Sequence, residues 1–264
     1  LNGTADGENG NDLLDGTGAT AGLTLLGSRG NDTIIGSSFN DRLDGGSEND
    51  SILGMAGNDT ITGGTGNDFL DGGAGLFDKL LEFPVGNVVL TNTALTGVGT
   101  DKLANIEEAE FIGNDANNFF DASKYTLGRV TLRGGAGDDT LYGTPLSDVY
   151  DGGAGFDTVK AVSLSNVVAT NATIVNSTSA DSLTSVEALD ITGHFTTGTT
   201  INASAFTGPT TLTGGAGADR LTSGQGNSVL RGNAGNDILV GGKGLDQLFG
   251  GNDNDSLTGG LGND

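Results

Sequence analysis

The sequence contains no cysteine and no tryptophan, and only 3 of its 264 residues are proline. The absence of cysteine excludes a disulfide scaffold, a thiolate zinc site and a cysteine nucleophile. Hydrophobic residues make up 34% of the chain and aromatic residues 5%, which argues against a compact globule built around one large core. No apolar run approaches the length of a membrane span, and no typical signal peptide precedes Leu1.

Positive charge is also scarce. The chain has 11 Lys and Arg residues against 34 Asp and Glu, for a formal net charge of -23. This charge argues against nucleic acid or an anionic membrane as partner and favours cations. The 49 glycines lose much backbone entropy on folding, so something beyond core burial should offset that loss.

Aspartate recurs every nine residues. Two residues after each of these anchor aspartates stands an apolar residue, such as Ile34 or Leu43, and glycine pairs such as Gly63-Gly64 precede them. The repeat unit is therefore G-G-x-G-x-D-x-U-x, where U is apolar. Its anchors are Asp32, Asp41, Asp50, Asp59 and Asp68, then Asp139, Asp148 and Asp157, then Asp219, Asp237, Asp246, Asp255 and Asp264.

This unit resembles the nonapeptide repeat of the RTX (repeats-in-toxin) family, the hemolysin-type calcium-binding repeat. The resemblance implies an all-β fold, a parallel β-roll in which six residues form a turn and three a short strand, with two repeats in each full coil. It also implies type I secretion and an extracellular or cell-surface location. Independently, a three-residue strand with one inward apolar side chain needs stacked neighbours to stay folded.

The repeats fall into three predicted calcium-binding blocks, residues 1–80, 134–159 and 214–264. Two inserts, 81–133 and 160–213, separate these blocks and duplicate each other. For example, Asp101 and its neighbours in the first insert match Asp181 and its neighbours in the second. The chain therefore contains a duplicated module.

We interpret the inserts as degenerate coils that have lost metal ligands, with Asn87 and Asn166 where anchors are expected. The alternative is a small β-domain looped out of the roll at each insert. Residues 101–111 have the pattern of a short helical turn.

We predict several Ca²⁺ ions at the turns, because calcium prefers oxygen ligands and aspartate beside glycine supplies carboxylates and carbonyls. The candidate ligands are Asp12 and all the anchors named above. Anchors two repeats apart should stack on the same edge of the roll, as Asp32 with Asp50. Asp12 and Asp32 are not separated by a whole number of repeats, which leaves the pairing of Asp12 open.

Some turns depart from the pattern. Phe39, Glu48, Leu146 and Asp253 replace the second-turn glycine, and Ser228 replaces an anchor, so we expect weaker binding there. Asparagine precedes most anchors, as Asn31 does, which we attribute to its tolerance of left-handed backbone.

Catalysis has little support in the sequence, and we predict no catalytic residues and no enzyme activity. The single histidine, His194, corresponds to Asn114 in the other insert, so the position does not require an imidazole.

Two functions remain. The chain is a calcium-stiffened segment of a bacterial surface protein of the S-layer or adhesin type, or it is the secretion and folding segment of an exported enzyme or toxin. Partners expected for the first are copies of itself or cell-envelope polysaccharide. An ice-binding or carbohydrate-binding face is a weaker third possibility. The chain begins and ends inside repeats, so we expect it to be part of a longer protein.

Overall fold

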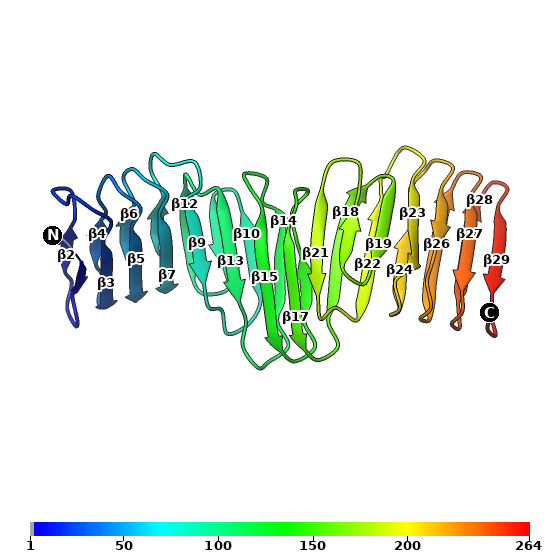
Figure 1. Cartoon of the computed structure of the whole chain (residues 1–264), viewed down its shortest axis with the longest axis horizontal. Helices are drawn as coiled ribbons and strands as arrows, with labels where there is room; N and C mark the ends of the chain where they lie inside the picture. The colour runs from blue at the N-terminus through cyan, green and yellow to red at the C-terminus, as the bar shows by residue number, and fades with distance from the viewer. Residues whose placement is uncertain (1–2) are drawn as a thin grey trace. The chain divides into compact units, whose positions relative to one another are not determined.

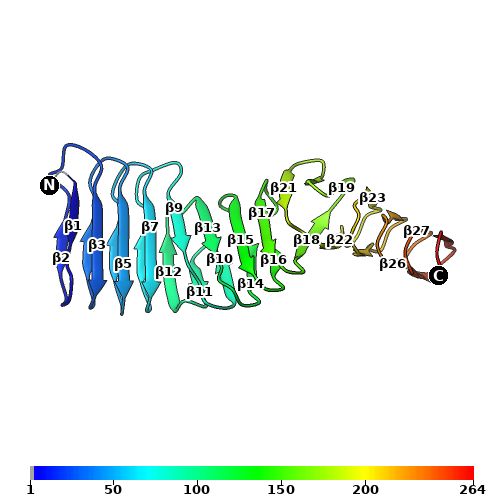
Figure 2. The ribbon, with the colours of Figure 1, turned by 60° about the horizontal axis from the view of Figure 1, so that its bottom comes forward.

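The computed structural model describes residues 3–264, apart from the side chain of Ser163, so the first two residues of the predicted block 1–80 lie outside the described residues. The chain divides into two compact units, Leu1–Arg133 (unit 1) and Gly134–Asp264 (unit 2). Between residues 3 and 264 the regular structure is β-strand, and no helix is present that could span a membrane. Each unit is a parallel β-solenoid with two sheets, so the predicted all-β roll is confirmed (Figures 1 and 2).

In unit 1 the chain alternates between the two sheets. One sheet has the order β1 (Thr4–Asp6), β3 (Thr24–Arg29), β5 (Arg42–Ser47), β7 (Thr60–Thr65), β9 (Lys79–Glu82), β13 (Glu108–Ile112) and β15 (Val130–Ala136). The other has the order β2 (Leu13–Asp15), β4 (Thr33–Ile35), β6 (Ser51–Leu53), β8 (Phe69–Asp71), β12 (Thr100–Ala104), β11 (Ala94–Thr96), β10 (Val88–Thr91) and β14 (Phe119–Lys124).

Unit 2 repeats this plan. One sheet has the order β17 (Val149–Ala154), β21 (Ala180–Thr184), β20 (Thr173–Val175), β19 (Val167–Thr170), β23 (Thr200–Ala205), β25 (Arg220–Thr222), β27 (Ile238–Gly242) and β29 (Ser256–Gly260). The other has the order β16 (Thr140–Tyr142), β18 (Thr158–Leu164), β22 (Ala188–Gly193), β24 (Thr210–Thr213), β26 (Ser228–Ala234) and β28 (Gln247–Asn252).

The core is a narrow row of the apolar residues that follow the anchors. Ile34 pairs with Ile52 and Ile52 with Leu70 in parallel register, and all three side chains are fully buried. Each strand is too short to hold its apolar residue out of water alone, so stacking identical positions stabilises all of them together. This register sets the anchors of successive coils one above another.

The two inserts stay within the sheets. In the first, β10 and β11 run antiparallel, as do β11 and β12, while β12 pairs in parallel with β8 and β10 with β14. In the second, β19, β20 and β21 form the same meander. The solenoid thus continues through both inserts, with one coil widened by a hairpin, and neither insert is looped out. The expected helical turn at residues 101–111 is wrong, because β12 and β13 occupy that segment.

Candidate metal centres

The anchor aspartates form hydrogen-bonded ladders along the edges of the coils. In each ladder the backbone N–H of one aspartate donates to Oδ1 of the anchor two repeats later, at 2.8 to 3.0 Å. The pairs are Asp32 with Asp50, Asp41 with Asp59, Asp50 with Asp68, Asp139 with Asp157, Asp219 with Asp237, Asp237 with Asp255, and Asp246 with Asp264. Every predicted stack is therefore present. Asp12 joins as well, since its N–H donates to Asp32 Oδ1 at 2.8 Å.

The second carboxylate oxygen of many anchors has no protein partner. These Oδ2 atoms are buried and make no hydrogen bond to any described residue; they belong to Asp12, Asp32, Asp50, Asp59, Asp68, Asp78, Asp101, Asp157 and Asp237. A buried carboxylate oxygen without a donor is costly in a folded protein. Buried carboxylates are usually paired with a positive charge or coordinate a metal cation.

A small cradle at a glycine lies beside each of these oxygens except that of Asp101. A Cβ built on Gly27 would lie less than 3.0 Å from both Asp32 Oδ2 and the carbonyl oxygen of Gly45 on the next coil. Only glycine fits there, because any side chain would enter the space that the two oxygens face. The cradle therefore presents a carboxylate oxygen and a backbone carbonyl to the same point, which is the donor set that calcium prefers.

The electrostatics of the metal-free turns favour a cation in the same way. Burial, opposed by the hydrogen bond from the Asp32 N–H and assisted by the charges of the stacked Asp68 and Asp32, raises the pKa of Asp50 to about 7. The pKa of Asp59 is also raised to about 7, and burial is the main cause. A bound divalent ion would relieve both the desolvation and the repulsion.

A second class of turn lacks this opening. We call a turn closed when the backbone N–H four residues before the anchor donates to the anchor's Oδ2. The donors are Ser37 to Asp41 (2.5 Å), Thr144 to Asp148 (2.6 Å), Gly215 to Asp219 (2.7 Å) and Gly242 to Asp246 (2.7 Å). The N–H supplies the partner that a cation would supply, so a closed turn has no need of one.

Three of the four closed turns follow a coil that has no aspartate at the ladder position. The residue that donates its N–H to Oδ1 of Asp41 is Leu23, and for Asp219 it is Thr199. For Asp246 it is Ser228, which the sequence identified as a lost anchor. In these three turns, therefore, closure accompanies the loss of the aspartate one coil earlier.

Backbone conformation separates the two classes. In open turns of the regular repeats the residue four before the anchor is left-handed, as are Ser28 before Asp32 (φ 75°) and Met55 before Asp59 (φ 78°), and this turns its N–H away from Oδ2. Among the residues that replace the second-turn glycine, Glu48 (φ 74°) and Asp253 (φ 77°) still adopt the left-handed form.

Phe39 and Leu146 do not adopt it, and both stand in closed turns. The backbone thus differs from the regular turn at these two positions, whereas Glu48 and Asp253 keep the regular backbone; the weaker binding expected at all four positions stays a prediction.

The asparagines before the anchors have another role than the one we expected. Asn31 and Asn49 are not left-handed. Instead Asn31 Oδ1 accepts from the N–H of Asn49, and Asn49 Oδ1 accepts from that of Asn67, at 3.1 and 2.8 Å. They form an outer ladder parallel to that of the aspartates, so their constant phase in the repeat reflects stacking between coils.

Sequence reasoning missed several acidic residues that join the ladders. The N–H of Asp68 donates to Asp101 Oδ1 at 3.0 Å, so Asp101, and not Asn87, occupies the next rung; Asp181 does the same for Asp148 instead of Asn166. Asp78 follows Asp59. The nine-residue period alone misses Asp101 and Asp181 because the hairpin inserts extra residues before them. The matching positions of Asp101 and Asp181 in the two inserts were the signal in the sequence that could have identified them.

The residues fit calcium as the bound ion. Calcium takes about six to eight oxygen ligands in flexible geometry, and a carboxylate meets a glycine carbonyl at the regular open turns, such as that of Asp32. Within the described part of the chain no cluster of three or more His, Cys, Asp or Glu side chains forms a metal site, so single carboxylates with backbone carbonyls must share the ligation. The ions would bind at the open turns, through the predicted aspartate ligands that stand there.

His194 occupies a turn of the second insert and has local partners. The ring Nδ1 of His194 lies 3.1 Å from the Thr197 hydroxyl. The backbone N–H of His194 donates to the Thr199 hydroxyl, just as the backbone N–H of Asn114 donates to Asn118 Oδ1. The shared turn explains why imidazole and amide are interchangeable at this position.

Comparison with known proteins identifies the repeats. The model of the RTX calcium-binding nonapeptide repeat (4 copies) matches residues 26–57, 44–75, 126–159, 208–230, 213–248 and 231–264, together more than half of the chain. No curated protein matches the chain.

Proposed function

Because this chain belongs to the RTX calcium-binding repeat family, whose repeats bind calcium, we propose that it is a non-enzymatic structural segment of a secreted bacterial surface protein, of the S-layer or adhesin type. The observation that carries the proposal is the set of buried Oδ2 atoms without partners in the open turns. Such a roll depends on its ions for stability, so calcium acts as part of the structure.

Calcium would couple folding to location. Extracellular calcium modules bind at about 10⁻⁴ to 10⁻³ M, far above cytoplasmic levels. The metal-free chain, at a formal charge of -23, would remain expanded in the cytoplasm and suit type I secretion, then fold outside the cell.

Assembly is the second part of the proposal. Stacked coils present the same side chains at regular intervals, and bound calcium both lowers the net charge and can bridge acidic surfaces. These properties favour association with further copies of the chain or with envelope polysaccharide.

Light scattering and electron microscopy across a calcium titration test the assembly. We expect ordered oligomers or sheets to form as calcium approaches millimolar levels. A chain that folds with calcium yet remains strictly monomeric at high concentration would contradict assembly and would favour the secretion and folding segment of an exported enzyme or toxin.

A further inference from the structure

The aspartate ladders continue into the inserts through glutamate. The N–H of Asp78 donates to Glu107 Oε2, and that of Asp157 donates to Glu187 Oε2, each at 3.0 Å. The two glutamates lie at matching positions of the duplicated inserts. In both units, therefore, a glutamate carboxylate stands where the next aspartate of a regular repeat would stand.

The aspartates at these two places are open. Asp78 and Asp157 are completely buried, and their Oδ2 atoms have no hydrogen-bond partner in the described chain. Burial raises the pKa of each aspartate, and the charge of the nearby glutamate raises it as well. Two carboxylates meet here without a lysine or arginine hydrogen-bonded to either of the two Oδ2 atoms.

A backbone carbonyl from the insert completes each arrangement. A Cβ on Gly72 would lie less than 3.0 Å from Asp78 Oδ2 and the Asn105 carbonyl oxygen. In unit 2, Gly152 has the same relation to Asp157 Oδ2 and the Ser185 carbonyl oxygen.

Both carbonyls come from residues in an uncommon conformation. Asn105 and Ser185 are left-handed, each with φ 49°, although neither is glycine. Such a backbone is sparsely populated by non-glycine residues and persists only where the surroundings determine it. Its recurrence at matching positions points to a shared requirement, namely a carbonyl aimed at the aspartate.

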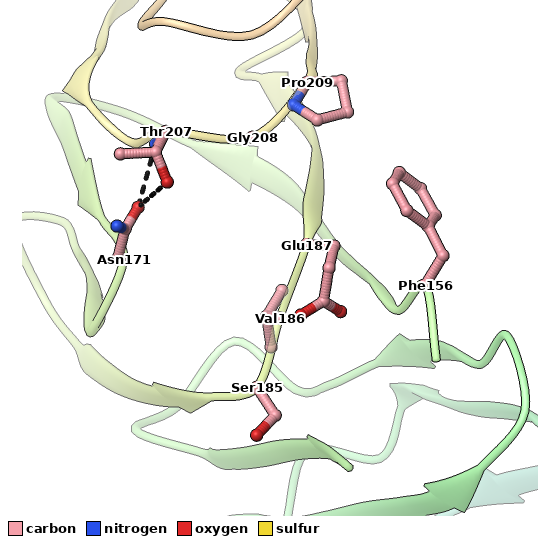
Figure 3. Close-up of a pocket in the computed structure, with 8 residues that line it drawn as sticks. All are labelled: Phe156, Asn171, Ser185, Val186, Glu187, Thr207, Gly208 and Pro209. Atoms are coloured by element: carbon pink, nitrogen blue, oxygen red, sulfur yellow. Dashed lines mark hydrogen bonds between the residues drawn. The ribbon is translucent and has the colours of Figure 1, made fainter. Parts of the chain in front are cut away.

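In unit 2 the arrangement borders an open pocket. Figure 3 shows Ser185 and Glu187 on one segment of its lining, with Phe156 on the opposite side of Glu187 from the hydrogen-bonded Asn171 and Thr207. The pocket gives a hydrated ion a path from solvent to the glutamate.

We propose that Asp78, Asn105 and Glu107, and likewise Asp157, Ser185 and Glu187, form two further calcium sites that tie each insert to the roll. Each site supplies two carboxylates and one carbonyl, with other backbone oxygens and water completing the shell. The family match includes Asp157, which is itself a repeat anchor, but it covers neither Asp78 nor the carbonyls and glutamates at 105, 107, 185 and 187, so the repeat pattern does not assign the part of each site that comes from the insert. The inference rests on calcium as the ion of the repeats, and it differs from the expectation that the inserts have lost their metal ligands.

The test compares two double variants of the full chain. Glu107→Gln with Glu187→Gln removes both charges but keeps an oxygen that can accept the Asp78 and Asp157 N–H. The control, Glu108→Gln with Asp190→Asn, removes the same charge from the adjoining strands, where Glu108 pairs with Arg129 and Asp190 with Lys160 at the surface. Bound calcium is counted by equilibrium dialysis with atomic emission, and hydrogen exchange is followed at residues 100–112 and 180–193.

We expect the first variant to bind two ions fewer than the wild type at a calcium level that just saturates the wild type, with at least tenfold weaker calcium-dependent protection of the inserts. The control should match the wild type. Equal ion counts and equal protection in the two double variants would overturn the inference. If the wild type itself bound no calcium, the result would instead contradict the proposal that the roll depends on calcium.

A further pair of variants separates binding from folding. Asn105→Gly with Ser185→Gly keeps both carbonyls and eases the left-handed backbone, so the ion count should not fall. A drop of two ions in this variant would contradict the role assigned to those carbonyls.

Discussion

The turns at Asp68 in unit 1 and Asp148 in unit 2 occupy the same place in the duplicated module, yet they differ in what they can bind. Both extend their ladder into a hairpin, since the Asp68 N–H donates to Asp101 Oδ1 and the Asp148 N–H to Asp181 Oδ1, each at 3.0 Å. The ladder is thus the same in the two copies. The difference lies in the cradle beside the anchor.

In the Asp68 turn the cradle contains charge. Gly64 is left-handed, Asp68 Oδ2 has no partner in the described residues, and the buried Glu82 places Oε1 3.3 Å from the Cβ position of Gly63. The carboxylate of Glu82 stands where a glycine carbonyl stands in the regular turns. This turn therefore has an additional carboxyl oxygen for a cation.

In the Asp148 turn the cradle is filled by neutral groups. The Tyr150 hydroxyl lies within 3.0 Å of the Cβ position of Gly143, and the Thr144 N–H and hydroxyl donate to the Asp148 carboxylate. The comparison shows that a ladder aspartate is not by itself a metal site. A metal site also requires that no protein donor or bulky group occupies the cradle.

Removing calcium should produce the largest difference between the two turns. With excess chelator we expect circular dichroism to show loss of β-structure, because the open turns then hold buried carboxylates without partners. Amide exchange should rise first near Asp50, Asp59 and Asp68 and last near Asp148, whose turn has its own donors. Unchanged dichroism in chelator would contradict calcium dependence, and uniform exchange would contradict the distinction between open and closed turns.

The stability of the chelated chain should depend strongly on pH. Burial raises the pKa of Glu82 to about 8 from 4.5, and that of Asp50 and Asp59 to about 7 from 3.8. Because the folded pKa values lie above the unfolded ones, the folded state gains stability by binding protons, and this gain is lost as pH rises from about 4 through 8. We therefore expect the chelated chain to denature at a lower urea concentration at pH 8 than at pH 5. With calcium present, the chain should instead denature at a higher urea concentration at pH 8 than at pH 5, because protons displace calcium from the carboxylates at low pH.

Opening the Asp148 turn should convert it to the form of Asp68. Thr144→Gly with Tyr150→Leu introduces the residues that unit 1 has in Gly64 and Leu70. In chelator we expect the variant to lose about 2 to 3 kcal/mol of unfolding free energy, because a buried aromatic ring and two donors are removed. With calcium it should bind one ion more than the wild type by equilibrium dialysis. An unchanged ion count would show that the cradle does not decide binding.

Neutralising Glu82 should give the smallest effect. Glu82→Gln keeps an acceptor for the Gly63 N–H, which now donates to Oε1 at 2.6 Å, but removes one charge beside Asp68. We expect calcium affinity at this turn to fall about tenfold, or about 1.4 kcal/mol, while stability in chelator rises because a buried acid has been removed. Ala161→Gln, at the matching position of unit 2, serves as the control and should leave calcium affinity unchanged.

The repeat period, together with the family resemblance that it carries, predicted the β-roll and its ladders correctly, because anchor, glycine pair and apolar residue recur at a fixed local spacing. Ile34, Ile52 and Leu70 had to share one face once nine residues made half a coil. The inserts were harder, since their hairpins bring Asp101 and Glu107 to rungs that no nine-residue count reaches. The widened coil changes which residues are neighbours without leaving a local signal.

What the sequence by itself determined is the phase of the repeat, and with it the anchors, the buried row and the preference for calcium, because these depend on chemistry within one nonapeptide. Only the tertiary structure decided which anchors are open. Asp219 and Asp246 follow complete G-G-x-G-x motifs, yet both turns are closed, because the coil before each presents Thr199 or Ser228 in place of an aspartate. The reason is physical: each site is formed between coils, so its state depends on a residue a full coil away that the chain brings near only by winding.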